Sequence, residues 1–304
     1  MPKARGRWRM WRQITRMINE FGYAKVNLTL HVTGQRPDGY HLLDSLVVFA
    51  GIGDRLYAAR SGVSSLTVEG PFGADIPTDM GNLVLRAAAL FSPHQGVAFT
   101  LQKNLPPASG IGGGSADAAA AIRAILRMLA DENDATATDD IFAGLDRDAV
   151  LRLGADVPVC LYSRPARMQG IGDNVAQVAC PEFWITLVNP RVAVPTPQVF
   201  AGLASKTNAP MPDLPVWPDA AALADWLHSQ RNDLEAPALH IAPVIADVLR
   251  ALRAQPGTLI ARMSGSGATC FALAADEATA KATATAIQAA HPGWWAAAGR
   301  VFPS

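Results

Sequence analysis

A two-domain α+β fold is predicted by three features of this sequence. Segments of alternating apolar and polar residues are mixed, in both halves, with segments whose apolar residues recur at helical spacing. The chain has 304 residues, more than most single domains contain. A change of composition at residues 165–180, followed by a Pro-rich stretch at 190–218, indicates a domain boundary. We therefore expect domains at residues 22–175 and 176–304, preceded by a basic, disordered extension at residues 1–21.

Composition narrows the classes of function. Half of the residues are hydrophobic, which supports a buried core, and Lys plus Arg equals Asp plus Glu at 26 each. A protein that covers nucleic acid normally carries excess positive charge. No apolar run approaches the ~18 residues that cross a bilayer. Three distant cysteines argue against a disulfide scaffold or structural zinc site. We expect no nucleic-acid or membrane partner and a cytoplasmic location.

The first twenty residues differ from the rest, because six basic residues alternate there with apolar ones and Glu20 is the one acid. An amphipathic helix that binds a membrane surface or nucleic acid is one interpretation. A disordered extension, or translated sequence upstream of the biological start with Met10 or Met17 as internal candidates, is the other, which we favour. A secretory signal is excluded because no continuous apolar segment is present.

In the first half, residues 24–32 alternate and predict a half-buried strand, with Lys25 and Asn27 on its polar face. Pro-Asp-Gly within residues 35–39 predicts a turn. Shorter strands are expected at residues 42–49, 55–59, 65–68 and 97–101, and a helix at 82–90. A loop of small residues at 105–117 leads into a helix at 118–130. Helices at 139–145 and 147–153 follow, with Gly154 placed to end the second.

The second half predicts a strand at residues 183–188 and, after the Pro-rich loop, helices at 220–229 and 244–254. Strands at 258–263 and 269–273 flank a second loop of small residues. A helix at 276–290 and a last strand complete the chain. No repeat of fixed period is present.

The Gly-rich loop is the strongest functional signal. Residues 109–115 contain four glycines and two serines and open a helix. Glycine lets the backbone approach a ligand, and the start of a helix offers free N–H groups, so this segment predicts a phosphate site. A flexible linker fits poorly, because a well-formed amphipathic helix follows at once. A Walker loop is excluded because no lysine follows a glycine, and a dinucleotide motif is excluded because Ser115 replaces its third glycine.

Two charged residues predict acid–base chemistry. Lys25 lies in a strand, where lysine is depleted, and Asp156 lies between a helix end and Pro158. Each alone fits an ordinary exposed position. As a pair, Lys25 would keep Asp156 ionised while Asp156 accepts a proton from a hydroxyl. The loop at residues 262–269 is either a hairpin turn or a second loop that closes over the same phosphates.

These three segments resemble, in order, the three motifs of the GHMP small-molecule kinases (the galacto-, homoserine, mevalonate and phosphomevalonate kinases). The matching segments are residues 25–28, 106–116 and 264–268. Further segments resemble those of one member of this family, whose substrate contains a cytidine diphosphate group. They are residues 36–41, 81–88, 153–158, 195–200 and 232–235. The resemblance spans roughly residues 24–300. It implies a GHMP kinase fold, with a Gly-rich loop in an N-terminal ATP-binding domain and a ferredoxin-like α/β C-terminal domain.

The resemblance also implies an activity. It implies transfer of a phosphoryl group from ATP, with Mg²⁺, to an alcohol of a small molecule that carries a cytidine diphosphate group. Another GHMP-type kinase, or a non-catalytic nucleotide-binding protein on the same fold, is the alternative. We expect no metal site built from protein ligands, and a monomer or weak homodimer.

Residue roles carried over from the resemblance complete the prediction. Asp156 would be the general base and Lys25 its charged partner. Asn82 is expected to contact adenine. The residues expected to contact the substrate are Asn27, Thr196, Tyr40 and Phe200, the last two on either side of the cytosine, and His41, which would bind its edge. The residues expected around the ATP phosphates are Pro106, Pro107, Ala108, Ser109, Gly110, Ile111, Gly112, Gly113, Gly114 and Ser115.

Overall fold

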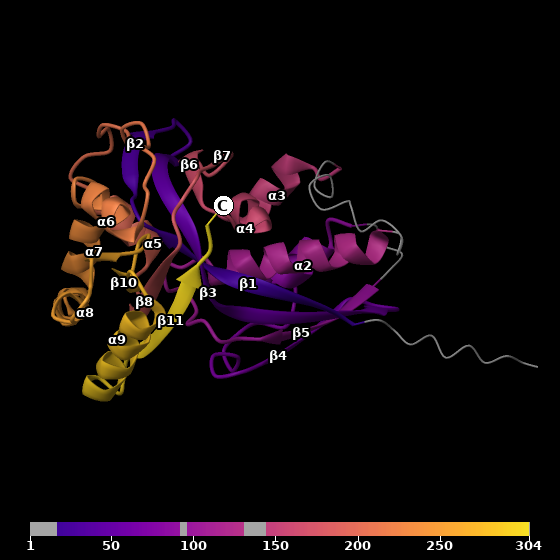
Figure 1. Cartoon of the computed structure of the whole chain (residues 1–304). Helices are drawn as coiled ribbons and strands as arrows, with labels where there is room; N and C mark the ends of the chain where they lie inside the picture. The colour runs from indigo at the N-terminus through magenta and orange to yellow at the C-terminus, as the bar shows by residue number, and fades with distance from the viewer. Residues whose placement is uncertain (1–16, 92–95, 131–143, 304) are drawn as a thin grey trace, which may run out of the picture.

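The computed structural model describes residues 17–91, 96–130 and 144–303 (Figure 1). The interpretations of residues 1–16, and most of the helix expected at 139–145, lie outside these described residues. Among the described helices, none is long and apolar enough to cross a membrane.

A long strand, β3, organises the first half. Strands β1 (Ile18–Asn27), β2 (His31–Gln35), β5 (Gly96–Gln102) and β6 (Ala166–Gly170) all pair antiparallel with β3 (His41–Ser61). Strand β4 (Ser65–Glu69) runs parallel to β5, and β7 (Asn174–Gln177) pairs with β6. The helices are α1 (Leu83–Ala88), α2 (Gly113–Leu129), α3 (Arg147–Leu153) and α4 (Val157–Tyr162). A run of buried alanines in the first turns of α2 lets this helix pack closely on β1 and β3.

The second half has a four-stranded antiparallel sheet in the order β11-β8-β10-β9. Its strands are β8 (Phe183–Asn189), β9 (Ile260–Met263), β10 (Cys270–Ala274) and β11 (Trp295–Val301). The helices are α5 (Thr196–Ala201), α6 (Ala220–His228), α7 (Glu235–Ile241), α8 (Val244–Arg253) and α9 (Glu277–Ala290). Helices join the first strand to the second and the third to the fourth, which is the ferredoxin-like arrangement. Val301 pairs with Ala50 of β3, so one hydrogen-bonded sheet connects both halves.

Apolar periodicity explains the helices that the sequence predicts. In α8, Ile245, Val248, Leu249 and Leu252 are buried, at the spacing that places side chains on one helical face. Helix α9 begins after Asp276, whose carboxylate accepts from the amide of Thr279. The predicted mixed α+β architecture is therefore confirmed, while the domain boundary near residue 175 stays a prediction.

The strand expected at residues 24–32 differs from the structure at both ends. Strand β1 begins at Ile18, so the prediction of disorder through residue 21 is wrong for residues 18–21. Glu20 is 6% exposed and pairs with Arg123 and Arg127 of α2, which are distant in sequence. At its other end, β1 stops at Asn27, and the chain bends before β2.

Strand β3 replaces the two strands expected at residues 42–49 and 55–59. The glycines between them suggest a turn in the sequence, but they serve the packing of β3 against β1. A Cβ at Gly53 would lie 2.2 Å from the carbonyl oxygen of Gly22. Five short elements of four to seven residues, α4, α5, α7, β6 and β7, are absent from the sequence prediction.

His31 on β2 predicts a loss of stability in acid. It is 1% exposed, and burial, followed by the charge of Arg231, lowers its pKa below the ordinary value of 6.5. The unfolded chain therefore binds a proton near pH 6.5, whereas the folded protein does not. The contribution of His31 to the free energy of unfolding is fully present above that pH. It falls as the pH drops, by up to about 1.4 kcal/mol per pH unit. Urea unfolding at pH 7.5 and 5.5 should show a larger loss for the unmodified protein than for His31→Gln. An equal loss in both would contradict this assignment.

Candidate active site

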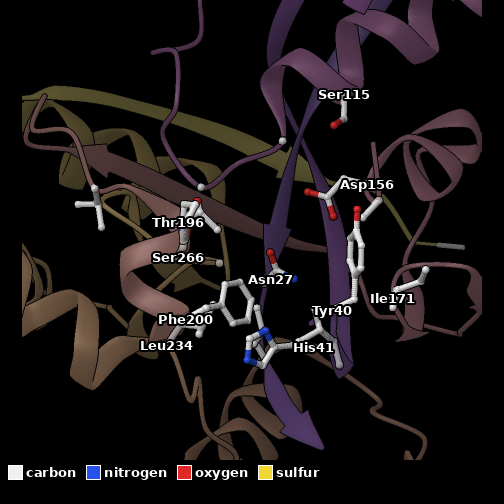
Figure 2. A pocket seen from close by; sticks show the side chains of 18 of the residues that line it. Asn27, Tyr40, His41, Ser115, Asp156, Ile171, Thr196, Phe200, Leu234 and Ser266 are labelled. Atoms are coloured by element: carbon white, nitrogen blue, oxygen red, sulfur yellow. The ribbon is translucent and has the colours of Figure 1, made fainter. Parts of the chain in front are cut away.

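A cavity of about 1050 Å³ lies between the two halves of the molecule (Figure 2). Its walls come from β1, the loop before α2, the start of α4, and α5 with the loop between β9 and β10. Most of the residues singled out in the sequence line it. They are Lys25, Asn27, Tyr40, His41, Ala108, Ser109, Gly110, Gly112, Gly113, Gly114, Ser115, Asp156, Thr196 and Phe200.

Lys25 and Asp156 form an ion pair in the wall of this cavity. The Nζ atom of Lys25 lies 2.9 Å from Oδ2 of Asp156 and donates to Oδ1 of Asn27, also at 2.9 Å. The Lys25 side chain is only 5% exposed, whereas that of Asp156 is 30% exposed and faces the cavity. A buried ammonium group requires such partners. The structure thus brings together the two residues that the sequence paired, and leaves the carboxylate accessible to a ligand.

The Gly-rich loop reaches the same place through two left-handed glycines. Gly110 has φ +76° and Gly112 has φ +64°, and Gly112 is the N-cap residue of α2. A Cβ on Gly112 would lie 3.2 Å from Cβ of Lys25. The hydroxyl of Ser109 donates to the carbonyl of Pro106 at 2.6 Å and closes the preceding turn. The N-terminal end of α2 therefore lines the cavity beside the ion pair, an arrangement that suits anions.

The second loop of small residues is both the hairpin between β9 and β10 and a support for the Gly-rich loop. The Ser264 hydroxyl accepts from the amide of Asn27 and donates to the carbonyl of Gly110, both at 3.1 Å. The amide of Thr269 donates to the carbonyl of Ser109 at 3.2 Å. Asn232, for which the sequence suggests no role, donates to the carbonyls on either side of Ser264. The hairpin interpretation is therefore confirmed, and closure of this loop over the phosphates stays a prediction.

The other end of the cavity is aromatic. The rings of His41 and Phe200 stack with centroids 4.6 Å apart and planes 22° apart. Tyr40 is 61% exposed, and in Figure 2 its ring stands apart from the stacked His41 and Phe200 rings, on the Asp156 side of the cavity. Burial, followed by the charge of Lys206, lowers the pKa of His41, which keeps its imidazole neutral near pH 7. The Thr196 and Ser266 hydroxyls hydrogen-bond at 2.8 Å in the adjacent wall. These groups offer a flat surface and polar edges to a planar ligand.

Four predicted ligand residues lie outside the cavity lining. Asn82 caps α1, since its side chain accepts from the amide of Val84 and donates to the carbonyl of Pro77. Ile111 is fully buried in the core, where its carbonyl accepts from the amide of Lys25. Pro106 is buried and Pro107 is exposed at the loop's entry. Asn82 thus stabilises α1, and the other three residues belong to the backbone of the Gly-rich loop. Contact of these four residues with ATP stays a prediction.

A buried charged cluster beneath the Gly-rich loop was missed by the sequence analysis. Lys103 Nζ lies 2.5 Å from Oδ2 of Asp54 and 2.7 Å from Oδ2 of Asp117, which is on α2. A Cβ on Gly113 would lie 3.2 Å from this ammonium group. Burial raises the pKa of Asp117 to about 7. The cluster anchors the start of α2, and no local pattern reveals it because its members are far apart in the sequence.

Comparison with known proteins agrees with this geometry. The domain described as "GHMP kinases N terminal domain" matches residues 82–164, and "GHMP kinases C terminal" matches residues 212–293. Over 288 residues the chain is 56% identical to the 4-diphosphocytidyl-2-C-methyl-D-erythritol kinase of Cereibacter sphaeroides, covering 94% of this chain and 99% of that protein. The chain belongs to the 4-diphosphocytidyl-2-C-methyl-D-erythritol kinase family of GHMP kinases.

Further relatives support the same family. The enzyme of this name from Ruegeria pomeroyi is 54% identical over 289 residues, which cover 94% of this chain and 99% of that protein. A crystal structure of 4-(cytidine 5'-diphospho)-2C-methyl-D-erythritol kinase aligns with a TM-score of 0.74 and 33% identity, over 93% of this chain and 99% of that one. The homoserine kinase of Cytophaga hutchinsonii, at 19% identity and a TM-score of 0.63 over 96% of each chain, shares the fold. The predicted GHMP kinase fold is confirmed.

Proposed function

We propose that this protein transfers the γ-phosphoryl group of ATP to the 2-hydroxyl of 4-diphosphocytidyl-2-C-methyl-D-erythritol, a step of the non-mevalonate route to isoprenoid precursors. The observation that carries the proposal is the 2.9 Å Lys25–Asp156 pair, placed in one cavity with the Gly-rich loop. The names of the relatives supply the substrate. A cytoplasmic location and a monomeric or weakly dimeric state remain predictions.

The proposed reaction assigns a task to each part of the site. The substrate hydroxyl loses its proton to Asp156 while its oxygen bonds to the γ-phosphorus, and the bond from that phosphorus to the bridging oxygen breaks to release ADP. Lys25 pairs with Asp156 at 2.9 Å and holds its carboxylate in place before the transfer. The first amides of α2 hold the phosphate oxygens. Phosphoryl transfer needs mainly positioning and charge neutralisation, which these groups supply.

Magnesium fits the donors available near the loop. Asp156 and the Ser115 hydroxyl line the cavity beside the start of α2. No group of three or more His, Cys, Asp or Glu suited to a metal exists in the described part of the chain. Mg²⁺ keeps several waters and binds through substrate phosphates with few protein donors, so this sparse set is sufficient. The Ser115 hydroxyl would hold the ion together with the ATP phosphates, whose charge the ion would neutralise, and Asp156 stays free to accept the proton.

The aromatic end of the cavity is the proposed cytidine site. Phe200 and Tyr40 supply faces for stacking, and the neutral imidazole of His41 supplies a donor and an acceptor for the edge of cytosine. In Figure 2, Asn27 lies between His41 and Asp156, and Thr196 lies on the opposite side of the cavity from Asp156, so the alcohol would be held among them. Because His41 already covers one face of Phe200, the cytosine stacks against the other face or displaces the imidazole.

Phe200→Ala should weaken binding of the cytidine substrate selectively. Loss of one stacking partner costs about 1–3 kcal/mol per base, or roughly a 5- to 150-fold rise in KM. The KM for ATP should change little, since Figure 2 shows Phe200 well separated from Ser115 at the start of α2. Steady-state kinetics with each substrate varied in turn measure both constants. Phe302→Ala, at an exposed site near the C-terminus, is the control. Equal effects on both KM values would argue against a cytidine site here.

Turnover tests the proposed function directly. The full chain, incubated with Mg-ATP and 4-diphosphocytidyl-2-C-methyl-D-erythritol, should release ADP and form a monophosphate ester visible by ³¹P NMR. Turnover of galactose, homoserine or mevalonate instead would identify another GHMP-type kinase. ATP binding without turnover of any of these alcohols would support the non-catalytic alternative.

A further inference from the structure

Arg123 lies where the three elements that carry the site come together. It belongs to α2, and its side chain is 13% exposed. Its Nε donates to Oε2 of Glu20 at 2.9 Å, and Nη2 donates to the carbonyl of Phe21 at 2.8 Å, both on β1. Its Nη1 donates to the carbonyls of Cys160 at 2.9 Å and Leu161 at 3.3 Å, both on α4. One guanidinium group therefore joins α2, β1 and α4.

Each of these elements holds one part of the site. Strand β1 carries Lys25, four residues after Phe21. Helix α4 begins directly after Asp156, which is its N-cap residue. Helix α2 begins at the end of the Gly-rich loop. Figure 1 shows α2 lying across β1, with α4 beside the N-terminal part of α2. A change at Arg123 would therefore alter the distance between the Lys25 ammonium group and the Asp156 carboxylate, although Arg123 contacts neither of them.

The physics of α4 explains why it needs this support. A helix of six residues is unstable alone, and the carbonyls of its last turn have no partners within the helix. Arg123 supplies hydrogen bonds to the Cys160 and Leu161 carbonyls and a positive charge at that end of the helix, where the Ser163 hydroxyl also donates to the Cys160 carbonyl at 2.8 Å. The opposite end, with Asp156, is thereby fixed in position. Buried Glu20 provides the counter-charge for the guanidinium group, and its second oxygen lies 3.0 Å from Arg127.

Arginine is suited to this position in a way that lysine is not. The planar guanidinium group has five N–H donors that point in fixed, divergent directions. In Arg123, three different nitrogen atoms donate the four hydrogen bonds to β1 and α4. An ammonium group on a flexible chain can satisfy the carboxylate of Glu20, but it cannot reach β1 and α4 at once in a fixed geometry.

We propose that Arg123 is a positioning residue that sets the distance between Lys25 and Asp156. The expected effect of Arg123 on kcat rests on the proposed function, whereas its expected effect on the Lys25–Asp156 distance does not. Arg123 does not line the cavity, so its role is to hold the site in position and not to contact the substrate.

The first test compares Arg123→Gln and Arg123→Lys with Arg127→Gln. Arg127 is a matched control, because it also pairs with Glu20 but its side chain is 55% exposed. In Arg123→Gln, kcat should fall about 10- to 100-fold, as expected for a misplacement near 1 Å, while the KM for ATP changes little. Arg123→Lys should retain an intermediate kcat, and Arg127→Gln should resemble the unmodified protein. Urea unfolding shows that each variant is folded under assay conditions. An unchanged kcat in folded Arg123→Gln, or an equal loss in Arg127→Gln, would overturn the proposal.

A second test separates positioning from general destabilisation. If Arg123 acts through Asp156, then Arg123→Gln should lower turnover much less in an Asp156→Asn background than in the unmodified one. A purely structural role predicts the same fold-loss in both backgrounds, and that result would overturn the proposal.

Crystal structures of the unmodified protein and of Arg123→Lys provide a readout that needs no turnover. The Lys25–Asp156 separation should exceed the 4.0 Å limit of an ion pair in the variant, and an unchanged separation would overturn the proposal. If the unmodified protein fails to phosphorylate the cytidine substrate, the proposed function is wrong, while this comparison still decides whether Arg123 sets the geometry.

Discussion

Replacing Asp156 with asparagine is expected to lower kcat by about 10²- to 10⁴-fold, the usual contribution of a positioned general base. Asparagine keeps the size of the side chain, but it cannot accept the hydroxyl proton. ATP binding should remain largely intact, because the backbone of the Gly-rich loop is unchanged. Steady-state turnover and calorimetric titration with an ATP analogue measure the two effects.

Asp38→Asn is the control for this change. Asp38 also lines the cavity, but its carboxylate pairs with Arg36 on an exposed turn. It should leave kcat nearly unchanged. Full activity in Asp156→Asn would remove Asp156 from the mechanism, and loss of ATP binding would mean that the side chain serves the phosphates rather than the hydroxyl.

Gly110→Ala is expected to separate the two loops that form the phosphate end of the cavity. Gly110 has φ +76°, and its Cβ would lie 2.7 Å from the carbonyl oxygen of Gly267 and 2.8 Å from that of Ser264. The left-handed backbone alone costs an alanine about 1–2 kcal/mol. The contact with backbone atoms adds to this cost, because neither carbonyl can rotate away like a side chain. The free energy of unfolding should fall by more than the backbone cost, and ATP affinity should fall with it.

Urea unfolding and ATP titration check this prediction against Gly293→Ala. A Cβ at Gly293 meets no atom within 4 Å, and its φ is not in the left-handed region. That variant should unfold at the same urea concentration as the unmodified protein. If Gly110→Ala keeps both stability and ATP affinity, the two loops are not rigidly held against each other.

The Gly-rich loop could be predicted from the sequence because its signal is local. Gly110 and Gly112 lie within a few residues of the helix that they open, and the left-handed φ of each is a property that the amino acid itself permits. The pairing of Lys25 with Asp156 has no such local signal. It could be proposed because both residue types suit one reaction, and the resemblance to the GHMP kinases placed them in one site.

The short elements near the site could not be predicted, because tertiary contacts determine them. Helix α4 is six residues long, begins with Val157 and Pro158, and shows no helical repeat in the sequence. The carbonyls of Cys160 and Leu161 in its last turn accept from Arg123, a residue that the sequence pattern assigns only to a helix face. Glu20 was placed in the extension for the same reason, since its burial depends on two arginines of α2. Local patterns reveal elements whose stability is local.

The division of the cavity between the two halves has an evolutionary consequence. The groups proposed to perform the chemistry, Lys25 and Asp156, belong to the first half, whereas Phe200 and Thr196 reach the cavity from the second. Substitutions of these two second-half residues can therefore change how the substrate is bound while leaving Lys25 and Asp156 in place. Descendants of one ancestral fold could acquire new acceptors in this way, and inhibitors that engage Phe200 would discriminate among relatives better than mimics of ATP.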